Sequence, residues 1–112
     1  MGKRKTGALT LSFLLYPCED DPRRFVAHCL ELDVVAVEHT KPKAILLLKE
    51  LITELFAAAL EDGTVDKLFR PAPAEYWRKL ANATPYRPPE RVLNRHIQAP
   101  PVRRVDYALA QV

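Results

Sequence analysis

Glycine is scarce in this chain, which has only Gly2, Gly7 and Gly63 among its 112 residues. The loops of P-loop proteins and dinucleotide-binding folds need several glycines at fixed spacing, so that the backbone can approach phosphate groups closely. The G-x-S-x-G turn of many serine hydrolases is also missing. These absences exclude the common nucleotide-binding loops and the serine nucleophile elbow.

The chain also has few cysteines and no long apolar run. Cys18 and Cys29 are too few for a disulfide framework, and we expect two reduced thiols with Cys29 buried. The longest apolar run, from Leu55 to Leu60, is far below the roughly 18 residues that a membrane span needs. The basic start, Met1 to Lys5, is not followed by the apolar region of a signal peptide. We therefore predict a cytoplasmic protein that does not enter a membrane.

Positive charge is present in excess, but it is unevenly spread. The formal net charge is +3. Residues 1–62 carry 8 basic and 10 acidic side chains, a balance of −2, and residues 63–112 carry 9 and 4, a balance of +5. The C-terminal half therefore suits an acidic partner or a nucleic acid, although a solvated basic surface would have the same composition.

The first third of the sequence has the patterns of three strands. Residues 8–16 alternate between apolar and polar side chains, which predicts a half-buried strand. Residues 24–30 would place Phe25, Ala27 and Cys29 on one side of a second strand, and residues 34–38 are β-branched and apolar enough for a third. Short polar segments separate the three. We predict a three-stranded antiparallel meander, with residues 1–7 as a flexible N-terminus.

A long amphipathic helix is predicted over residues 41–62. Thr40 is a good N-cap, and Gly63 can adopt the left-handed conformation that ends a helix. The polar half of the helix contains Lys49, Glu50, Thr53 and Glu54. So wide an apolar half should cover a sheet, with Leu48, Leu51 and Leu55 buried. That half comprises Ala44, Ile45, Leu47, Leu48, Leu51, Ile52, Leu55, Phe56, Ala58 and Ala59.

Residues 63–112 form a proline-rich extension of the same domain. Residues 74–81 can form a short helix, in which Tyr76 and Trp77 either stack on nucleic acid or, as we expect, anchor the helix to the body. Residues 102–109 alternate again and predict a final strand that can lie at an edge. The fold class is α+β, in the order β-β-β-α-β, with residues 8–62 as its core.

The stretch from Phe25 to Thr40, with the helix after it, resembles the HicB family of antitoxins. The matching features are an aromatic strand, the Glu31-Leu32 turn, a short strand from Asp33, and Thr40 and Ala44 at the start of the helix. The resemblance implies a partial ribonuclease H-like fold that binds and silences a HicA-type toxin ribonuclease. It covers residues 8–62.

The sequence also departs from the HicB pattern. Leu30 stands where the family often has proline, Glu38-His39 replaces Gly-Asp, and Lys41-Pro42-Lys43 replaces an acidic first turn. Prolines after Gly63 interrupt every candidate recognition helix, so we expect the usual C-terminal DNA-binding module of the family to be absent.

We expect no catalytic site, cofactor or metal. A ribonuclease H-like site needs several carboxylates around divalent metals, but the first strand has no Asp or Glu. Glu31 and Asp33 alone are weak evidence for an ion. His28 and Cys29 are neighbours on a strand and point to opposite faces, so they should not share a zinc. His28 is then expected to face solvent or a partner.

Two binding hypotheses remain, together with a prediction of self-association. The first is that the acidic N-terminal portion of the chain faces a basic, RNA-binding toxin. The second is a nucleic-acid-binding regulator that uses C-terminal arginines. We also predict a homodimer through Tyr107 and Leu109; its rival is a monomer whose extension folds back on its own sheet. The partner-binding candidates are Glu19, Asp20, Asp21, His28, Glu31, Asp33 and Glu38, and the nucleic-acid candidates are Arg87, Arg91, Arg95, Arg103 and Arg104.

Overall fold

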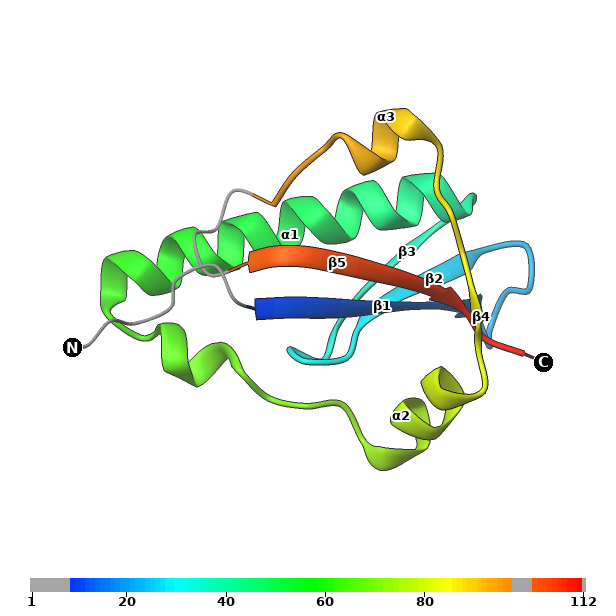
Figure 1. The fold of residues 1–112 in the computed structure, drawn as a ribbon, viewed down its shortest axis with the longest axis horizontal. Helices are drawn as coiled ribbons and strands as arrows, with labels where there is room; N and C mark the ends of the chain where they lie inside the picture. Colours follow the sequence, from blue (N-terminus) through cyan, green and yellow to red (C-terminus); the bar gives the residue numbers. More distant parts are fainter. Residues whose placement is uncertain (1–8, 98–101, 112) are drawn as a thin grey trace.

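A computed structural model describes residues 9–97 and 102–111, which form an α+β fold with a mixed five-stranded sheet. The predicted flexible N-terminus, residues 1–7, lies outside this range. Helix α1 covers one face of the sheet, and α2 lies on the other side (Figure 1). The elements in chain order are β1 (Leu9–Pro17), β2 (Phe25–Cys29), β3 (Val34–Glu38), α1 (Lys41–Asp62), the 3₁₀ turn η1 (Val65–Leu68), α2 (Ala74–Ala81), β4 (Thr84–Pro85), α3 (Glu90–Leu93) and β5 (Val102–Leu109).

The strands are ordered β3-β2-β1-β5-β4 across the sheet. Strands β1, β2 and β3 are antiparallel neighbours, whereas β5 runs parallel to β1. The final strand therefore has a neighbour on each side, although β4 pairs only with its last residues, Ala108 and Leu109. A parallel pairing of this kind requires a long crossover, which α1, α2 and α3 supply.

Strand β1 lies at the centre of the sheet and is buried on both faces. Leu11, Phe13 and Leu15 belong to the buried cluster beneath α1. Leu14 points to the opposite face, where it is fully buried with Leu30 under the α2 segment. The alternation in the sequence identifies the α1 face, while the second buried face depends on residues far away in the chain.

Helix α1 begins and ends at the signals in its sequence. The Thr40 side chain accepts a hydrogen bond from the backbone N–H of Lys43 at 3.2 Å, and Gly63 ends the helix at φ 68°. The buried stripe is narrower than the apolar half of the helix, and it consists of Ala44, Ile45, Leu48, Lys49, Ile52, Phe56 and Ala59.

Three expectations for α1 are corrected. Leu51 is only half-buried and Leu55 is 37% exposed, because the sheet contacts a narrow stripe and Leu55 faces an open groove beside η1. Lys49 was expected on the polar face but is only 3% exposed. The α3 segment covers that flank of the helix, and its Val92 is buried in the same cluster.

Helix α2 is anchored to the sheet by its aromatic residues, as expected. The Trp77 indole N–H donates to the Ala72 carbonyl at 3.0 Å, and the Tyr76 ring stacks on Tyr16 at 5.9 Å between centroids. Just before the helix, the Ala72 N–H donates to the carbonyl of Leu30 at 2.8 Å. These contacts hold the extension against the end of β2.

Tyr107 and Leu109 pack against the chain's own core. The Tyr107 ring meets Phe13 edge-on at 5.8 Å between centroids, and both Tyr107 and Leu109 contact the cluster beneath α1. The extension thus folds back on its own sheet, and these two side chains are engaged within the subunit. No helix in residues 9–97 and 102–111 is long and apolar enough to cross a membrane.

Candidate functional site

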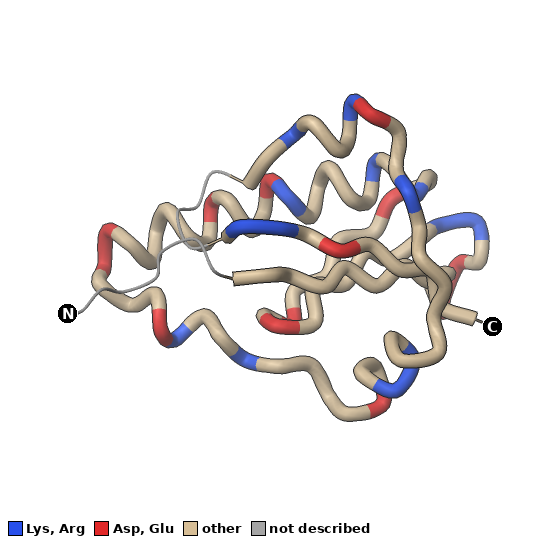
Figure 2. The backbone as a smooth tube through the Cα atoms, viewed as in Figure 1, with Lys and Arg blue, Asp and Glu red and all other residues tan. Residues whose placement is uncertain are grey.

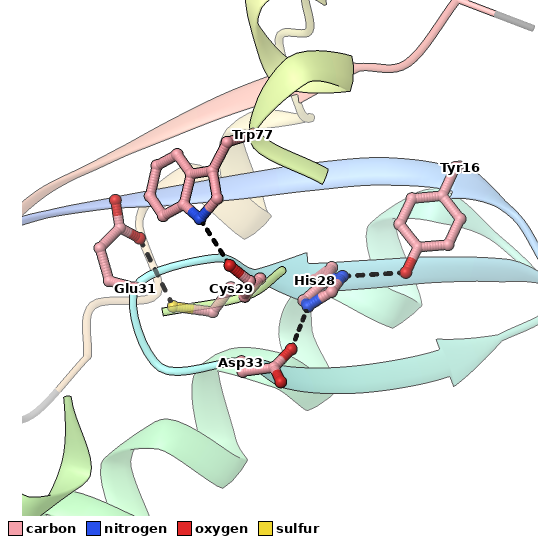
Figure 3. Close-up of polar contacts among 7 residues, drawn as sticks. Tyr16, His28, Cys29, Glu31, Asp33 and Trp77 are labelled. Atoms are coloured by element: carbon pink, nitrogen blue, oxygen red, sulfur yellow. Dashed lines mark hydrogen bonds and ion pairs between the residues drawn. The ribbon is translucent and has the colours of Figure 1, made fainter. Parts of the chain in front are cut away.

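The most connected polar cluster lies around His28, on the face of the sheet that α2 covers (Figure 3). His28 Nε2 lies 2.8 Å from Asp33 Oδ1, and Nδ1 lies 2.9 Å from the Tyr16 hydroxyl. The Tyr76 ring packs against the imidazole at 4.7 Å between centroids. Four parts of the fold converge here: β1, β2, the β2–β3 turn and α2.

His28 is only 2% exposed, so the expectation that it faces solvent or a partner is wrong. Strand alternation correctly separates it from Cys29, which lies in the cluster beneath α1. Alternation cannot show that α2 returns to cover the opposite face. Tyr76 and Trp77, the aromatic pair in α2, are the signal that would have indicated such a cover.

The hydrogen bonds of the His28 cluster link β1 and β2 to the β2–β3 turn. Burial raises the pKa of Tyr16, with Tyr76 and Asp33 adding to the effect, so its hydroxyl stays protonated. That hydroxyl can donate to Nδ1 while the Nε2–H donates to Asp33. Both ring nitrogens of His28 are thus engaged in hydrogen bonds within the cluster.

Glu31 connects the β2–β3 turn to β1. Its carboxylate accepts from the Ser12 backbone N–H at 2.7 Å and from the Ser12 hydroxyl at 2.8 Å. The Cys29 thiol lies 3.9 Å from the same carboxylate, and burial together with the Glu31 charge raises its pKa to about 12. Cys29 is therefore a poor nucleophile, and Glu31 is used within the fold.

The acidic candidates do not form one surface. Glu19 and Asp20 are exposed in the β1–β2 turn, and Glu38 ends β3 opposite Phe25. Asp33 and Glu31 lie in the β2–β3 turn, at the other end of the hairpin, and acidic positions are visible at both ends in Figure 2.

Asp21, beside Glu19 and Asp20, is engaged locally. Its carboxylate accepts from the backbone N–H of Arg23 at 3.1 Å and from the Arg23 guanidinium at 3.2 Å. These two bonds hold the pKa of Asp21 below its usual value. Glu19 and Asp20 are thus the exposed acids that remain at this end of the hairpin.

The arginine candidates are all exposed, and three of them meet at one pocket. Arg95, Arg103 and Arg104 line a cavity of about 240 Å³ between the α3 segment and β5, together with Lys49 and His96. Arg87 and Arg91 lie outside its lining. Lys49 was not a candidate, although its place four residues after the buried Ile45 is a signal that could have indicated it.

Across the described residues, no group of three or more His, Cys, Asp or Glu side chains is placed to hold a metal ion. No protein-family model, curated protein or solved structure matches the chain.

Proposed function

We propose that this chain is a non-catalytic, HicB-like antitoxin-type protein that binds and occludes a HicA-like toxin ribonuclease. The observation that carries the proposal is the path of the chain from β1 to β5. Three antiparallel neighbours are followed by a long capped helix, and the last strand returns in parallel beside β1. This path supports the β-β-β-α-β arrangement that the resemblance implies.

The residues that carry the resemblance have structural roles that favour it. Glu31 and Leu32 form the β2–β3 turn, Glu31 fixes that turn to Ser12, and Thr40 caps α1. Such features would preserve a recognition scaffold across sequences that differ at the surface. They bear on the scaffold alone, and the identity of the partner rests on the resemblance.

The exposed acids of the β1–β2 turn are the residues best placed to meet a basic toxin. Glu19 and Asp20 are exposed and have no ion-pair partner among the described residues. A toxin that binds RNA presents basic side chains, which an acidic turn can attract and orient. His28 and Glu31 contribute indirectly, because they hold the β2–β3 hairpin in place.

The test is inhibition of RNA cleavage by a purified HicA-type toxin. We expect cleavage to stop when the protein is added in equimolar amount. Reversing charge in the double variant Glu19→Lys/Asp20→Lys should weaken binding at least about tenfold, which corresponds to about 1.4 kcal/mol. The matched control, Glu61→Lys/Asp62→Lys, makes the same charge change at the far end of α1 and should inhibit normally. RNA cleavage that continues in excess protein would reject the proposed function. An equal loss of toxin binding in both variants would reject the β1–β2 turn as the binding surface.

A second candidate is a nucleic-acid-binding regulator, favoured by the exposed arginines of the extension. Arg87 and Arg91 flank the start of α3, and Arg95, Arg103 and Arg104 lie around one cavity. Contacts to phosphates would give binding that falls steeply with salt. A gel-shift titration at physiological salt tests it: a retained complex that the five Arg→Gln substitutions abolish would favour this function over the first.

A further inference from the structure

Lys49 is a buried lysine whose ammonium bonds to backbone carbonyls rather than to a carboxylate. Its Nζ donates to the Val92 carbonyl at 2.9 Å and to the Arg95 carbonyl at 2.8 Å, and it lies 5.3 Å from the centre of the Tyr107 ring. Within residues 9–97 and 102–111, no acidic side chain forms an ion pair with it. Burial, with a contribution from Arg95, lowers its pKa from 10.5 to about 8.

The cavity beside Lys49 is lined by further cations. On its polar side are Arg95, His96, Arg103 and Arg104, and its apolar wall is formed mainly by Ile97, Val102, Val105 and Tyr107. None of its described lining residues is an Asp or Glu, whereas Glu50 and Glu54 line an adjoining pocket that shares Lys49, Arg95 and His96. Two adjacent basic positions lie near the start of β5 (Figure 2).

Nearby acids neutralise only part of this charge. The Arg104 guanidinium bonds to both carboxylate oxygens of Asp106, at 3.1 and 3.3 Å. Arg95 lies 3.8 Å from Glu50, which is a loose contact between two exposed side chains. Lys49 and Arg103 have no acidic partner in the described part of the chain. Two positive charges at the cavity are thus left without a counter-charge.

A purely structural role explains only part of this arrangement. The Lys49 ammonium satisfies carbonyls at the end of α3, but it has three N–H donors and two of them are used. Lys49 also lines the cavity, where its ammonium lies 5.3 Å from the centre of the Tyr107 ring. A helix-capping role for Lys49 also does not require Arg103, which comes from a different element and is exposed.

We propose that the cavity between the α3 segment and β5 binds a phosphate-monoester dianion, held by Lys49, Arg95 and Arg103. A dianion matches the two cations that lack acidic partners. Arginine guanidinium groups bind phosphate oxygens through paired N–H donors, and a buried ammonium supplies a point charge. The volume of about 240 Å³ lies below the range of drug-sized ligand sites, so it suits one charged group rather than a large ligand.

Such a phosphate could belong to a small molecule or to the end of a nucleic acid. The arms of the test separate these sources. Isothermal titration at about pH 7.5 uses inorganic phosphate, a 5′-phosphorylated oligoribonucleotide and the same oligonucleotide with a 5′-hydroxyl. Preference for the phosphorylated oligonucleotide, reversed by inorganic phosphate, assigns a nucleic-acid end. Saturable binding of inorganic phosphate without that preference assigns a small molecule. Both outcomes support the site.

The decisive variants are Arg103→Gln and Lys49→Met, with Arg87→Gln as the matched control. Arg103 is exposed, so its substitution should leave the fold intact while reducing phosphate affinity at least about tenfold. Arg87 is also exposed but does not line the cavity, and its substitution should change the affinity less than about twofold. The proposal is overturned if no phosphate binds at millimolar concentration, or if Arg103→Gln and Arg87→Gln behave alike.

Discussion

At the scale of single residues, Lys49 should give the protein a pH-dependent stability. Its folded pKa of about 8 lies below its ordinary value of 10.5, so the charged lysine disfavours the folded state below pH 8. Between about pH 8 and 10.5 the unfolded chain binds the proton that the folded chain has released, and stability should rise with pH. The raised pKa of Cys29, about 12, and that of Tyr107 act in the opposite direction above pH 9 and 10.

The measurement is urea unfolding of the wild type and of Lys49→Met at pH 7.5 and 9. We expect the wild type to gain stability relative to the variant between these two values, because the variant has no proton to release at this position. The titratable groups that line the two pockets with Lys49 remain in both proteins: Arg95, His96, Arg103, Arg104, Tyr107, Glu50 and Glu54. If the unfolding free energy changed equally in the two proteins between these pH values, the lowered pKa of Lys49 would be contradicted.

His28 gives a second prediction at this scale. His28→Ala should cost about 2–3 kcal/mol, because it removes two hydrogen bonds and leaves the Tyr16 hydroxyl without its partner beneath α2. The exposed His39→Ala is the matched control, and it should change the unfolding free energy by less than about 0.5 kcal/mol. Similar small losses for both histidines, measured by urea unfolding, would show that the cluster contributes little.

At the scale of secondary-structure elements, the capping residues and the apolar patterns predicted the elements whose bounds depend on residues close in the sequence. Helix α1 spans Lys41–Asp62 between the Thr40 cap and Gly63, and β3 spans Val34–Glu38, both as the sequence pattern indicates. The burial of Lys49 and His28 was not predicted, since it depends on α3 and α2, which return from far along the chain. The parallel pairing of β5 with β1 was not predicted for the same reason, because the two strands are far apart in the sequence.

The narrow buried stripe of α1 leads to a graded series of leucine variants. Leu48→Ala should cost about 2–5 kcal/mol, because Leu48 is fully buried and the change leaves a cavity. Leu55→Ala should cost less than about 1 kcal/mol, since that side chain is partly in solvent, and the half-buried Leu51 should fall between them. Chemical denaturation measures the unfolding free energy of the three variants. If Leu55→Ala lost as much stability as Leu48→Ala, the helix would be rotated relative to the sheet.

At the scale of the whole molecule, β3 is the exposed edge of the sheet. It pairs with β2 on one side, and no described strand pairs with it on the other. Its sequence, Val-Val-Ala-Val-Glu, is rich in β-branched residues, and Val35 is 46% exposed. An edge of this kind offers backbone donors and acceptors to another strand. The predicted homodimer therefore has a better-placed interface here than at Tyr107 and Leu109.

Pairing of β3 with a second copy is self-complementary. In an antiparallel pair related by a two-fold axis at Ala36, Val35 lies opposite Val37 of the second copy. Each contact occurs twice, as in any two-fold interface. We therefore predict a homodimer with a continuous sheet through β3.

Sedimentation at tens of micromolar tests this dimer. Val35→Lys should produce a monomer, because it places two like-charged, solvated side chains beside the new strand pair. Leu60→Lys is the matched control: Leu60 is 51% exposed and near the end of α1, away from β3, so this variant should sediment as the wild type does. A monomeric wild type would exclude the dimer. A Val35→Lys variant that remains dimeric would place the interface elsewhere, because in this register each lysine would displace a Val35–Val37 contact and lie diagonally across from the other lysine.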